Sequence, residues 1–249
     1  MVHAARNGFY YALDRTNGAF VAGRQYVDEL NWTSGLDPKT GRPRNYDPTK
    51  DVQIYAAGSH PIRGQGPSKT CPSHSGGKNW PPSAYDPELG LLFIPSIEGC
   101  DSIINAEQQS FVDQGGTVKP RQRFAGGNTK NLPERRYGSL KAIDPASGEI
   151  KAWVNMPYPN YGGVLATAGN LVFIGQLDGT FYAYDARTLQ ELWSFNAGTG
   201  INAPPISYSV NGKQYIAVLV GSKQPAAVLQ DSPELKNTST ASMLYVFSL

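Results

Sequence analysis

Few residues in this sequence have side chains suited to metal or redox chemistry: two cysteines, Cys71 and Cys100, and three histidines, His3, His60 and His74. Cys71 and His74 form a C-x-x-H pair, but a zinc site needs a second pair of ligands at a similar spacing, and the chain has none. The pattern favours a disulfide bond over two free buried thiols, and both over zinc. A disulfide would indicate an oxidising compartment.

The composition excludes several classes of protein. Of 249 residues, 17% are charged, 40% are apolar and 11% are aromatic, which is sufficient for a packed core and unlike a disordered chain. The net charge of +2 comes from 22 basic and 20 acidic residues spread along the sequence, so we expect no nucleic-acid partner. Apolar runs such as 215–220 have the length of a strand, so no transmembrane segment is expected. The N-terminal sequence also lacks the pattern of a secretion signal.

An Ala-x-Asp motif recurs through the chain, in residues 9–18, 139–148 and 180–189. In each copy, alternating apolar residues precede an aspartate and a turn sequence, which is typical of a strand, a turn and a second strand. Asp144 and Asp185 lie 41 residues apart, within the spacing expected of propeller blades. The aspartates are expected to cap the turns.

The remaining pattern predicts strands throughout and no helix. Strands are expected near 8–22, 81–96, 137–155 and 164–195, and in a last blade of three strands that ends at Leu249. The predicted fold is therefore all-β: an arc of three to four blades of a larger β-propeller, with an unclosed edge at each end. Residues 1–249 would form one domain. A long basic loop at about 97–136 is expected to be a solvated surface rather than a lid or docking site.

Four stretches carry a resemblance to a known family: residues 5–18, 71–87, 161–193 and 203–221. Together they resemble the pyrroloquinoline-quinone (PQQ) dependent alcohol dehydrogenases of the methanol and ethanol type, which are eight-bladed periplasmic propellers. The resemblance covers essentially the whole chain and implies that it corresponds to the C-terminal part of such an enzyme.

The resemblance implies a cofactor-binding role for Arg6, Asn79, Tyr161 and Gly162. Arg6 matches the basic residue that approaches the quinone carbonyls, where a guanidinium would stabilise developing negative charge. Asn79 matches an asparagine that contacts PQQ. Tyr161 and Gly162 stand where an aromatic residue presents its backbone to the cofactor. The structural alternatives are a surface ion pair for Arg6 and a turn role for Asn79.

The same resemblance implies two structural features. Methanol dehydrogenases have a cysteine pair at the separation of Cys71 and Cys100, which implies a disulfide between them. Trp193 matches a tryptophan that docks neighbouring blades, eight residues after Asp185. The two other copies have Ala22 and Ala152 at this position, with Trp153 one residue late, and Leu189 replaces the usual turn glycine.

The implied activity is oxidation of a primary alcohol to an aldehyde, with electrons passed to a cytochrome c. The family's catalytic aspartate and its ligands for Ca²⁺ or a lanthanide lie upstream of the Arg6 motif, so we predict no catalytic and no metal-binding residue in this chain. The expected partners are an alcohol, a cytochrome c and either the missing N-terminal half of the propeller or a second copy. The alternative is a non-catalytic PQQ-repeat scaffold that binds other proteins.

Overall fold

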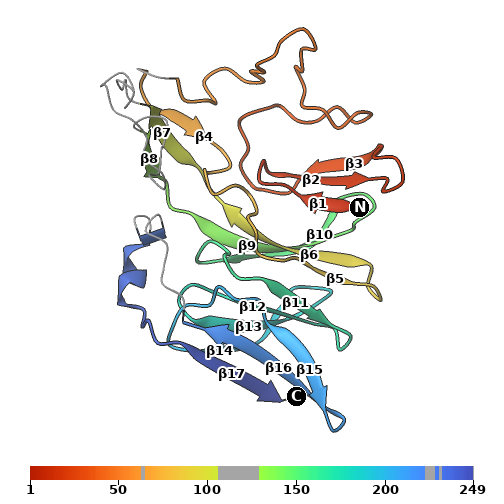
Figure 1. The fold of residues 1–249 in the computed structure, drawn as a ribbon, viewed down its shortest axis with the longest axis vertical. Helices are drawn as coiled ribbons and strands as arrows, with labels where there is room; N and C mark the ends of the chain where they lie inside the picture. Colours follow the sequence, from red (N-terminus) through yellow and green to blue (C-terminus); the bar gives the residue numbers. More distant parts are fainter. Residues whose placement is uncertain (63–64, 106–128, 222–227, 230–231, 249) are drawn as a thin grey trace, which may run out of the picture.

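The computed structural model describes residues 1–62, 65–105, 129–221, 228–229 and 232–248. Antiparallel sheets dominate this part of the chain, and four of them follow one another along the long axis of the molecule (Figure 1). A short 3-10 helix, η1 (Pro233–Asn237), precedes the last strand. No helix among the described residues is long and apolar enough to cross a bilayer.

The two middle sheets have four strands each. One has the order β10-β9-β6-β5 and consists of β5 (Ala84–Asp86), β6 (Leu91–Glu98), β9 (Tyr137–Ile143) and β10 (Ile150–Met156). The next has the order β11-β12-β13-β14 and consists of β11 (Val164–Thr167), β12 (Leu171–Gly175), β13 (Thr180–Asp185) and β14 (Glu191–Asn196). Both are antiparallel throughout.

The two outer sheets of the stack have three strands each. The first sheet consists of β1 (Val2–Ala4), β2 (Phe9–Leu13) and β3 (Phe20–Gln25). The last sheet consists of β15 (Ile206–Val210), β16 (Lys213–Val220) and β17 (Met243–Ser248). The repeated Ala-x-Asp motif lies on β2, β9 and β13, so the first sheet corresponds to the second, third and fourth strands of a complete blade. The four sheets confirm the prediction of an all-β partial propeller.

The repeated aspartates cap their turns as predicted. In all three copies the carboxylate Oδ1 accepts a hydrogen bond from the backbone N–H two residues later, at 2.7 to 2.9 Å. Leu189 holds a positive φ of 54°, a conformation that the other two copies give to glycine. Its side chain is buried in the core between the two middle sheets, and this burial offsets the strain of the backbone.

Each pair of neighbouring sheets packs through its own apolar cluster. The three clusters are centred on Tyr10 and Ile94, on Phe93 and Ile174, and on Phe181 and Val218. Face-to-face packing of successive sheets is the arrangement that propeller blades use.

The tryptophan positions differ between blades. Trp193 packs edge to face against Phe247 of the last sheet, with 5.3 Å between ring centroids, so it docks one blade on the next. Trp153 instead leaves 64% of its surface exposed, while Ala152 packs toward the core. The late position of this tryptophan therefore turns it to solvent, because side chains alternate between the two faces of a strand.

A fifth sheet pairs two strands from the segment expected to be a loop, 97–136, with one strand that precedes that segment. It has the order β4-β7-β8 and consists of β4 (Ser68–Thr70), β7 (Asp101–Asn105) and β8 (Thr129–Pro133). Residues 106–128 of the predicted loop lie outside the described residues. Arg136 was expected on a solvated loop but is fully buried. The pairing of β4 with β7 is non-local, and these short polar strands lack the apolar alternation that would reveal them in sequence.

Candidate functional site

Arg6 lies at the tip of the tight hairpin that joins β1 to β2. The hairpin closes through a hydrogen bond from the Ala5 N–H to the Phe9 carbonyl, at 2.9 Å. The Arg6 side chain is exposed, and its guanidinium donates a 2.5 Å hydrogen bond to the backbone carbonyl of His74.

The loop before β5 approaches the Arg6 backbone closely. The Gly77 N–H donates to the Arg6 carbonyl at 2.9 Å. Gly76 has a φ of 80°, and a Cβ at this position would lie 2.8 Å from the Cβ of Arg6. Only glycine meets both requirements, so the glycine pair after Ser75 has a structural reason.

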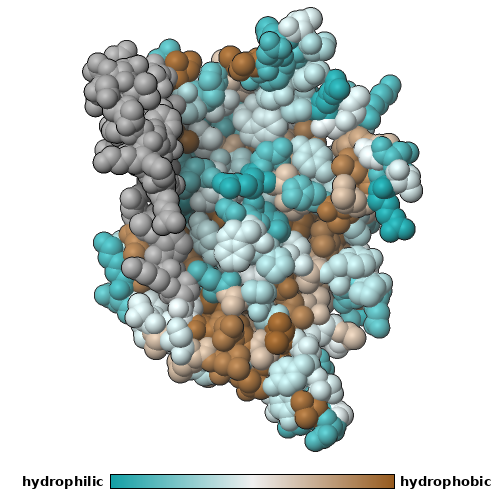
Figure 2. Space-filling model, in the orientation of Figure 1, coloured by the Kyte–Doolittle hydropathy of each residue, from teal (hydrophilic) through white to brown (hydrophobic). Residues whose placement is uncertain are grey.

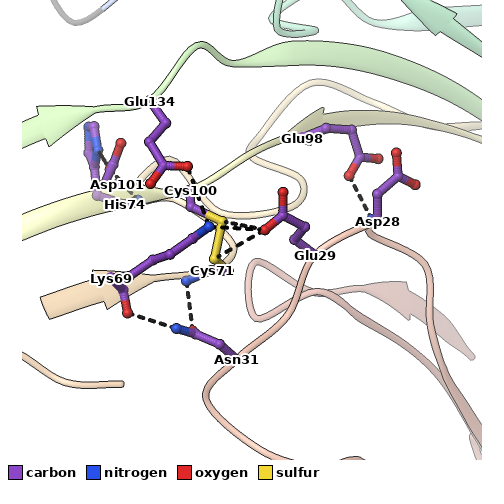
Figure 3. The surroundings of a disulfide bond; sticks show 10 residues. All are labelled: Asp28, Glu29, Asn31, Lys69, Cys71, His74, Glu98, Cys100, Asp101 and Glu134. Carbon is purple, nitrogen blue, oxygen red and sulfur yellow. Dashed lines mark hydrogen bonds and ion pairs between the residues drawn. A yellow bond between two sulfur atoms is a disulfide. The ribbon is translucent and has the colours of Figure 1, made fainter. Parts of the chain in front are cut away.

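Cys71 and Cys100 form a disulfide, as the sequence predicted (Figure 3). Both cysteines are buried, and their Cα atoms lie 4.5 Å apart, at the point where β4 and β7 pair. The Glu29 carboxylate lies 3.4 Å from the Cys100 sulfur. Asn31 exchanges backbone and side-chain hydrogen bonds with Cys71, which ties the chain after β3 to the disulfide.

Asp101 directly follows the disulfide and holds His74. One of its carboxylate oxygens accepts a 2.8 Å hydrogen bond from the His74 backbone N–H and a second bond from His74 Nδ1. Burial alone would raise the pKa of the Asp101 carboxyl. The hydrogen bonds and charge of His74, with the charge of Arg136, outweigh burial and hold the pKa below its usual value.

Ser75 links the other predicted residues to this loop. Its hydroxyl lies 3.1 Å from the Tyr161 hydroxyl and accepts a 3.1 Å hydrogen bond from the buried Arg136. Its carbonyl accepts a hydrogen bond from the Asn79 amide at 3.2 Å. The structure therefore brings Arg6, Asn79 and Tyr161 to one loop, residues 71–80.

The roles of Asn79 and Gly162 within the fold are structural. The Asn79 side chain also accepts a hydrogen bond from the Trp80 N–H at 2.9 Å, so both ends of its amide serve the loop. Gly162 is buried, and a Cβ there would lie 2.8 Å from the Gly175 carbonyl oxygen. The glycine thus permits close approach of two backbones.

A cleft of about 310 Å³ opens beside Arg6. It is lined by Arg6, Asn7, Trp32, Thr70, Cys71, Pro72, Ser73, His74 and Gly76. The hydroxyls of Thr70 and Ser73 are buried and have no hydrogen-bond partner among the described residues. The volume suits a small ligand, and the Arg6 guanidinium suits an anionic ligand rich in oxygen atoms. PQQ, a tricarboxylated aromatic quinone, has this chemistry, so the residues fit it.

The described residues do not fit the implied metal ion. Among them, one group of three potential ligands lies close together, formed by Glu29, Cys71 and Cys100. The two sulfurs are bonded to each other, whereas Ca²⁺ takes six to eight oxygen ligands. The described part of the chain therefore offers no cage for Ca²⁺ or a lanthanide.

Several buried charged residues near this site were missed from the sequence. Lys141 on β9 is buried and donates to Glu98 at 2.7 Å and to Asp28 at 2.9 Å. A lysine within the otherwise apolar run of β9 was the available signal. No comparable signal marked Asp101 or Arg136, because their burial depends on pairing between distant segments.

Comparisons with known proteins identify relatives of this chain. The family profile described as glucose/ethanol/alcohol dehydrogenase, beta-propeller domain (PQQ) matches residues 127–216. The quinoprotein ethanol dehydrogenase of Pseudomonas putida is 38% identical over 224 residues, which are 88% of this chain and 34% of the relative. The quinoprotein alcohol dehydrogenase PedH of Pseudomonas putida is 36% identical over 99% of this chain and 40% of its own length.

Solved structures give the same result. A europium-containing methanol dehydrogenase matches 100% of this chain and 44% of its own chain, with a TM-score of 0.82 and 27% identity. The quinohemoprotein alcohol dehydrogenase of Comamonas testosteroni matches 88% of this chain and 31% of its own, with a TM-score of 0.72 and 35% identity. The chain thus spans between about a third and a half of the proteins that it matches, and it belongs to the PQQ-dependent, or quinoprotein, alcohol dehydrogenase family of β-propellers.

Proposed function

We propose that this chain forms part of a PQQ-dependent alcohol dehydrogenase that oxidises a primary alcohol to an aldehyde, and that it supplies the Arg6 side of the quinone-binding shell. One observation carries the proposal. The Arg6 guanidinium is held at the His74 carbonyl, beside a cleft whose volume and polar lining suit an anionic quinone.

Oxidation of an alcohol to an aldehyde removes two electrons and two protons. PQQ, when bound, is the acceptor of the electron pair. Arg6 would bind quinone oxygen atoms and stabilise the negative charge that reduction places on them, since a guanidinium stays protonated at any physiological pH.

Asn79, Tyr161 and Gly162 are proposed to complete this side of the shell. Their support is the shared attachment of Asn79 and Tyr161 to Ser75, next to the residues that line the cleft. In this arrangement they would act by fixing the shape of the loop. Because the cleft lining contains no carboxylate, the alcohol proton would be taken by a base contributed from elsewhere.

The wider assembly is also a proposal. We expect a complementary propeller portion, or a second copy, to cover the open blades, and a metal ion of the kind the family implies to bind outside the described residues. A cytochrome c is the proposed acceptor of the electrons, as the family resemblance implies. The disulfide supports a periplasmic location, where such bonds persist.

The alternative, a non-catalytic scaffold, has less support. A scaffold has no need of a guanidinium held beside a cleft. It would bind through its edges, and PQQ would leave its behaviour unchanged.

The test joins this chain to the N-terminal portion of the Pseudomonas putida quinoprotein ethanol dehydrogenase. Ethanol-dependent dye reduction is measured with PQQ and Ca²⁺. We expect activity from the joined protein, a loss of about 10²-fold in Arg6→Ala, and a smaller loss in Asn79→Ala. Arg187→Ala, which removes an exposed arginine at a distant turn, is the matched control and should keep full activity. Full activity in Arg6→Ala would refute the proposed role of Arg6.

A further inference from the structure

Arg6 is an exposed arginine whose side chain is nevertheless held in one place. A long exposed side chain normally samples many rotamers, and fixing it has an entropic cost of up to about 2 kcal/mol. The described contact that opposes this freedom is the hydrogen bond from the guanidinium to the His74 carbonyl. The position of the guanidinium therefore depends on how firmly the His74 peptide is held.

The backbone of His74 is held by Asp101 through the peptide group that precedes the one Arg6 contacts. The carboxylate of Asp101 is fully buried, and one oxygen accepts from both the backbone N–H and Nδ1 of His74. Two hydrogen bonds to one charged acceptor hold the His74 ring and the Ser73–His74 peptide, which adjoins the His74 carbonyl that Arg6 contacts. Bonds to an ionised group are stronger than neutral ones, so this anchor resists thermal rotation of the loop.

Asp101 is itself anchored in the frame of the fold. It pairs with Thr70 in the β4–β7 register and follows Cys100, whose disulfide joins it to Cys71. The loop between these points is held again by a 2.9 Å bond from the Ser73 N–H to the Gly99 carbonyl. Figure 3 shows Asp101 and His74 side by side, next to the disulfide.

We infer that Asp101 and His74 are positioning residues that set the Arg6 guanidinium at the cleft through the His74 carbonyl. The identity of the ligand that Arg6 then meets rests on the proposed function, but the positioning itself does not. Neither residue needs to touch the ligand. They hold the Arg6 guanidinium in place before a ligand binds. Binding then does not include the entropic cost of ordering this side chain.

The test follows Arg6 directly by NMR in the chain labelled with ¹⁵N, with its signals assigned by their loss in Arg6→Lys. In the wild type we expect slow rotation about the Arg6 Nε–Cζ bond, because the guanidinium is hydrogen-bonded. Asp101→Leu removes the acceptor with a side chain of similar size and should speed this rotation at least tenfold. His74→Ala removes only the ring donor and should give a smaller increase. His74→Asn, whose amide can replace Nδ1 as donor, should restore the wild-type rate.

Asp86→Leu is the matched control. Asp86 is also a buried aspartate, but its carboxylate accepts from the backbone of Glu88 and Leu89 at the β5–β6 turn. The control should leave the Arg6 rotation rate unchanged. Unchanged Arg6 signals in both Asp101→Leu and His74→Ala, or an equal change in Asp86→Leu, would overturn the inference.

A PQQ titration of the same variants, each mixed with the N-terminal portion of the Pseudomonas putida quinoprotein ethanol dehydrogenase and followed by tryptophan quenching, separates this inference from the proposed function. A tighter complex in the wild type than in Asp101→Leu supports both. Absence of any PQQ binding, combined with the expected NMR changes, would refute the ligand while the positioning role stands.

Discussion

On the first sheet, Phe9 lies on the face that points away from the neighbouring sheet, and it meets Trp32 edge to face with 5.8 Å between ring centroids. Tyr55 packs edge to face against Trp32, with 5.5 Å between ring centroids. The residues that carry these rings, 30–56, are irregular in structure and run alongside β1–β3 (Figure 1). We call them the covering segment. Through it, Phe9 keeps only 3% of its surface exposed.

The last sheet has no such cover among the described residues. Its inner face packs on β12 and β13 through Ile216 and Val218. Its outer face presents Leu219 beside Leu244, with 61% and 60% of their surfaces exposed. Ile206, Tyr208, Val210 and Val246 are also exposed on this sheet. Figure 2 shows apolar surface gathered at this end of the molecule.

The two ends of the chain are suited to different surroundings. A contiguous apolar face of this kind usually marks a contact with another protein surface, whereas a face already covered needs none. The covered end also carries the cleft, the disulfide and Arg6. The chain therefore separates the end that carries the proposed ligand cleft from an end suited to association.

Breaking the disulfide should have the largest effect on stability. Cys71→Ser with Cys100→Ser releases a 29-residue loop and should lower the free energy of unfolding by about 3 to 4 kcal/mol. Because Asn31 is bonded to Cys71, proteolysis within the covering segment should also speed up. Urea unfolding and limited proteolysis measure the two effects. Equal protease resistance would show that the disulfide does not anchor this segment.

The second largest loss of stability is expected when the Trp32 ring, which joins the covering segment to the first sheet, is removed. Trp32→Ala should cost about 2 to 3 kcal/mol, since a half-buried indole and its hydrogen bond to the Asn7 carbonyl are lost. Trp153→Ala removes an indole that is 64% exposed and should change stability by no more than about 0.5 kcal/mol. Equal losses in the two variants, measured by urea unfolding, would contradict a packed cover on the first sheet.

Acid should weaken the fold through carboxyls near the covered end. The pKa of Asp101 and of Asp28 lies below the ordinary value of 3.8, despite burial, because hydrogen bonds and positive charges favour the ionised form. The stability that they add is present above the unfolded value and is lost as the pH falls through the folded values. Urea unfolding at about pH 6, 4 and 3 should show this loss, with a shallower pH dependence in Asp101→Asn. A wild-type stability that is constant down to about pH 3 would refute it.

Substitutions on the exposed outer face of the last sheet should affect stability least. Leu219→Ser and Leu244→Ser should each change the free energy of unfolding by no more than about 0.5 kcal/mol, since both side chains are mostly exposed. Together they should weaken self-association, which sedimentation velocity detects over a range of concentrations. Val52→Ser, at an exposed valine away from this sheet, is the control. A wild-type chain that stays monomeric at all concentrations would contradict the assignment of this face.

The sequence supported the strands whose pattern is local. Alternating residues and capped turns in the Ala-x-Asp copies predicted β2, β9 and β13 with their partners. This was possible because neighbouring residues determine strand register and turn type. The strands β4, β7 and β8 could not be found in this way. Their pairing joins segments about 30 residues apart and leaves little apolar signal.

The candidate site likewise contains residues that the sequence indicated and contacts that only the fold reveals. Arg6, Asn79 and Tyr161 came from a family resemblance, and the structure adds that all three meet one loop. The link from Asp101 through His74 to Arg6 had no signal in sequence, since it depends on a carboxylate brought into place by a distant strand pairing. Local pattern predicts elements, whereas such links require the fold.

The most direct test of the account is a PQQ binding titration, followed by tryptophan quenching. It compares this chain alone with the chain mixed with the N-terminal portion of the Pseudomonas putida quinoprotein ethanol dehydrogenase. We predict weak binding by the chain alone, at least tenfold tighter binding by the mixture, and loss of most of that gain in Arg6→Ala. Binding that is equally tight in the chain alone and in the mixture, or that is unchanged in Arg6→Ala, would contradict the account.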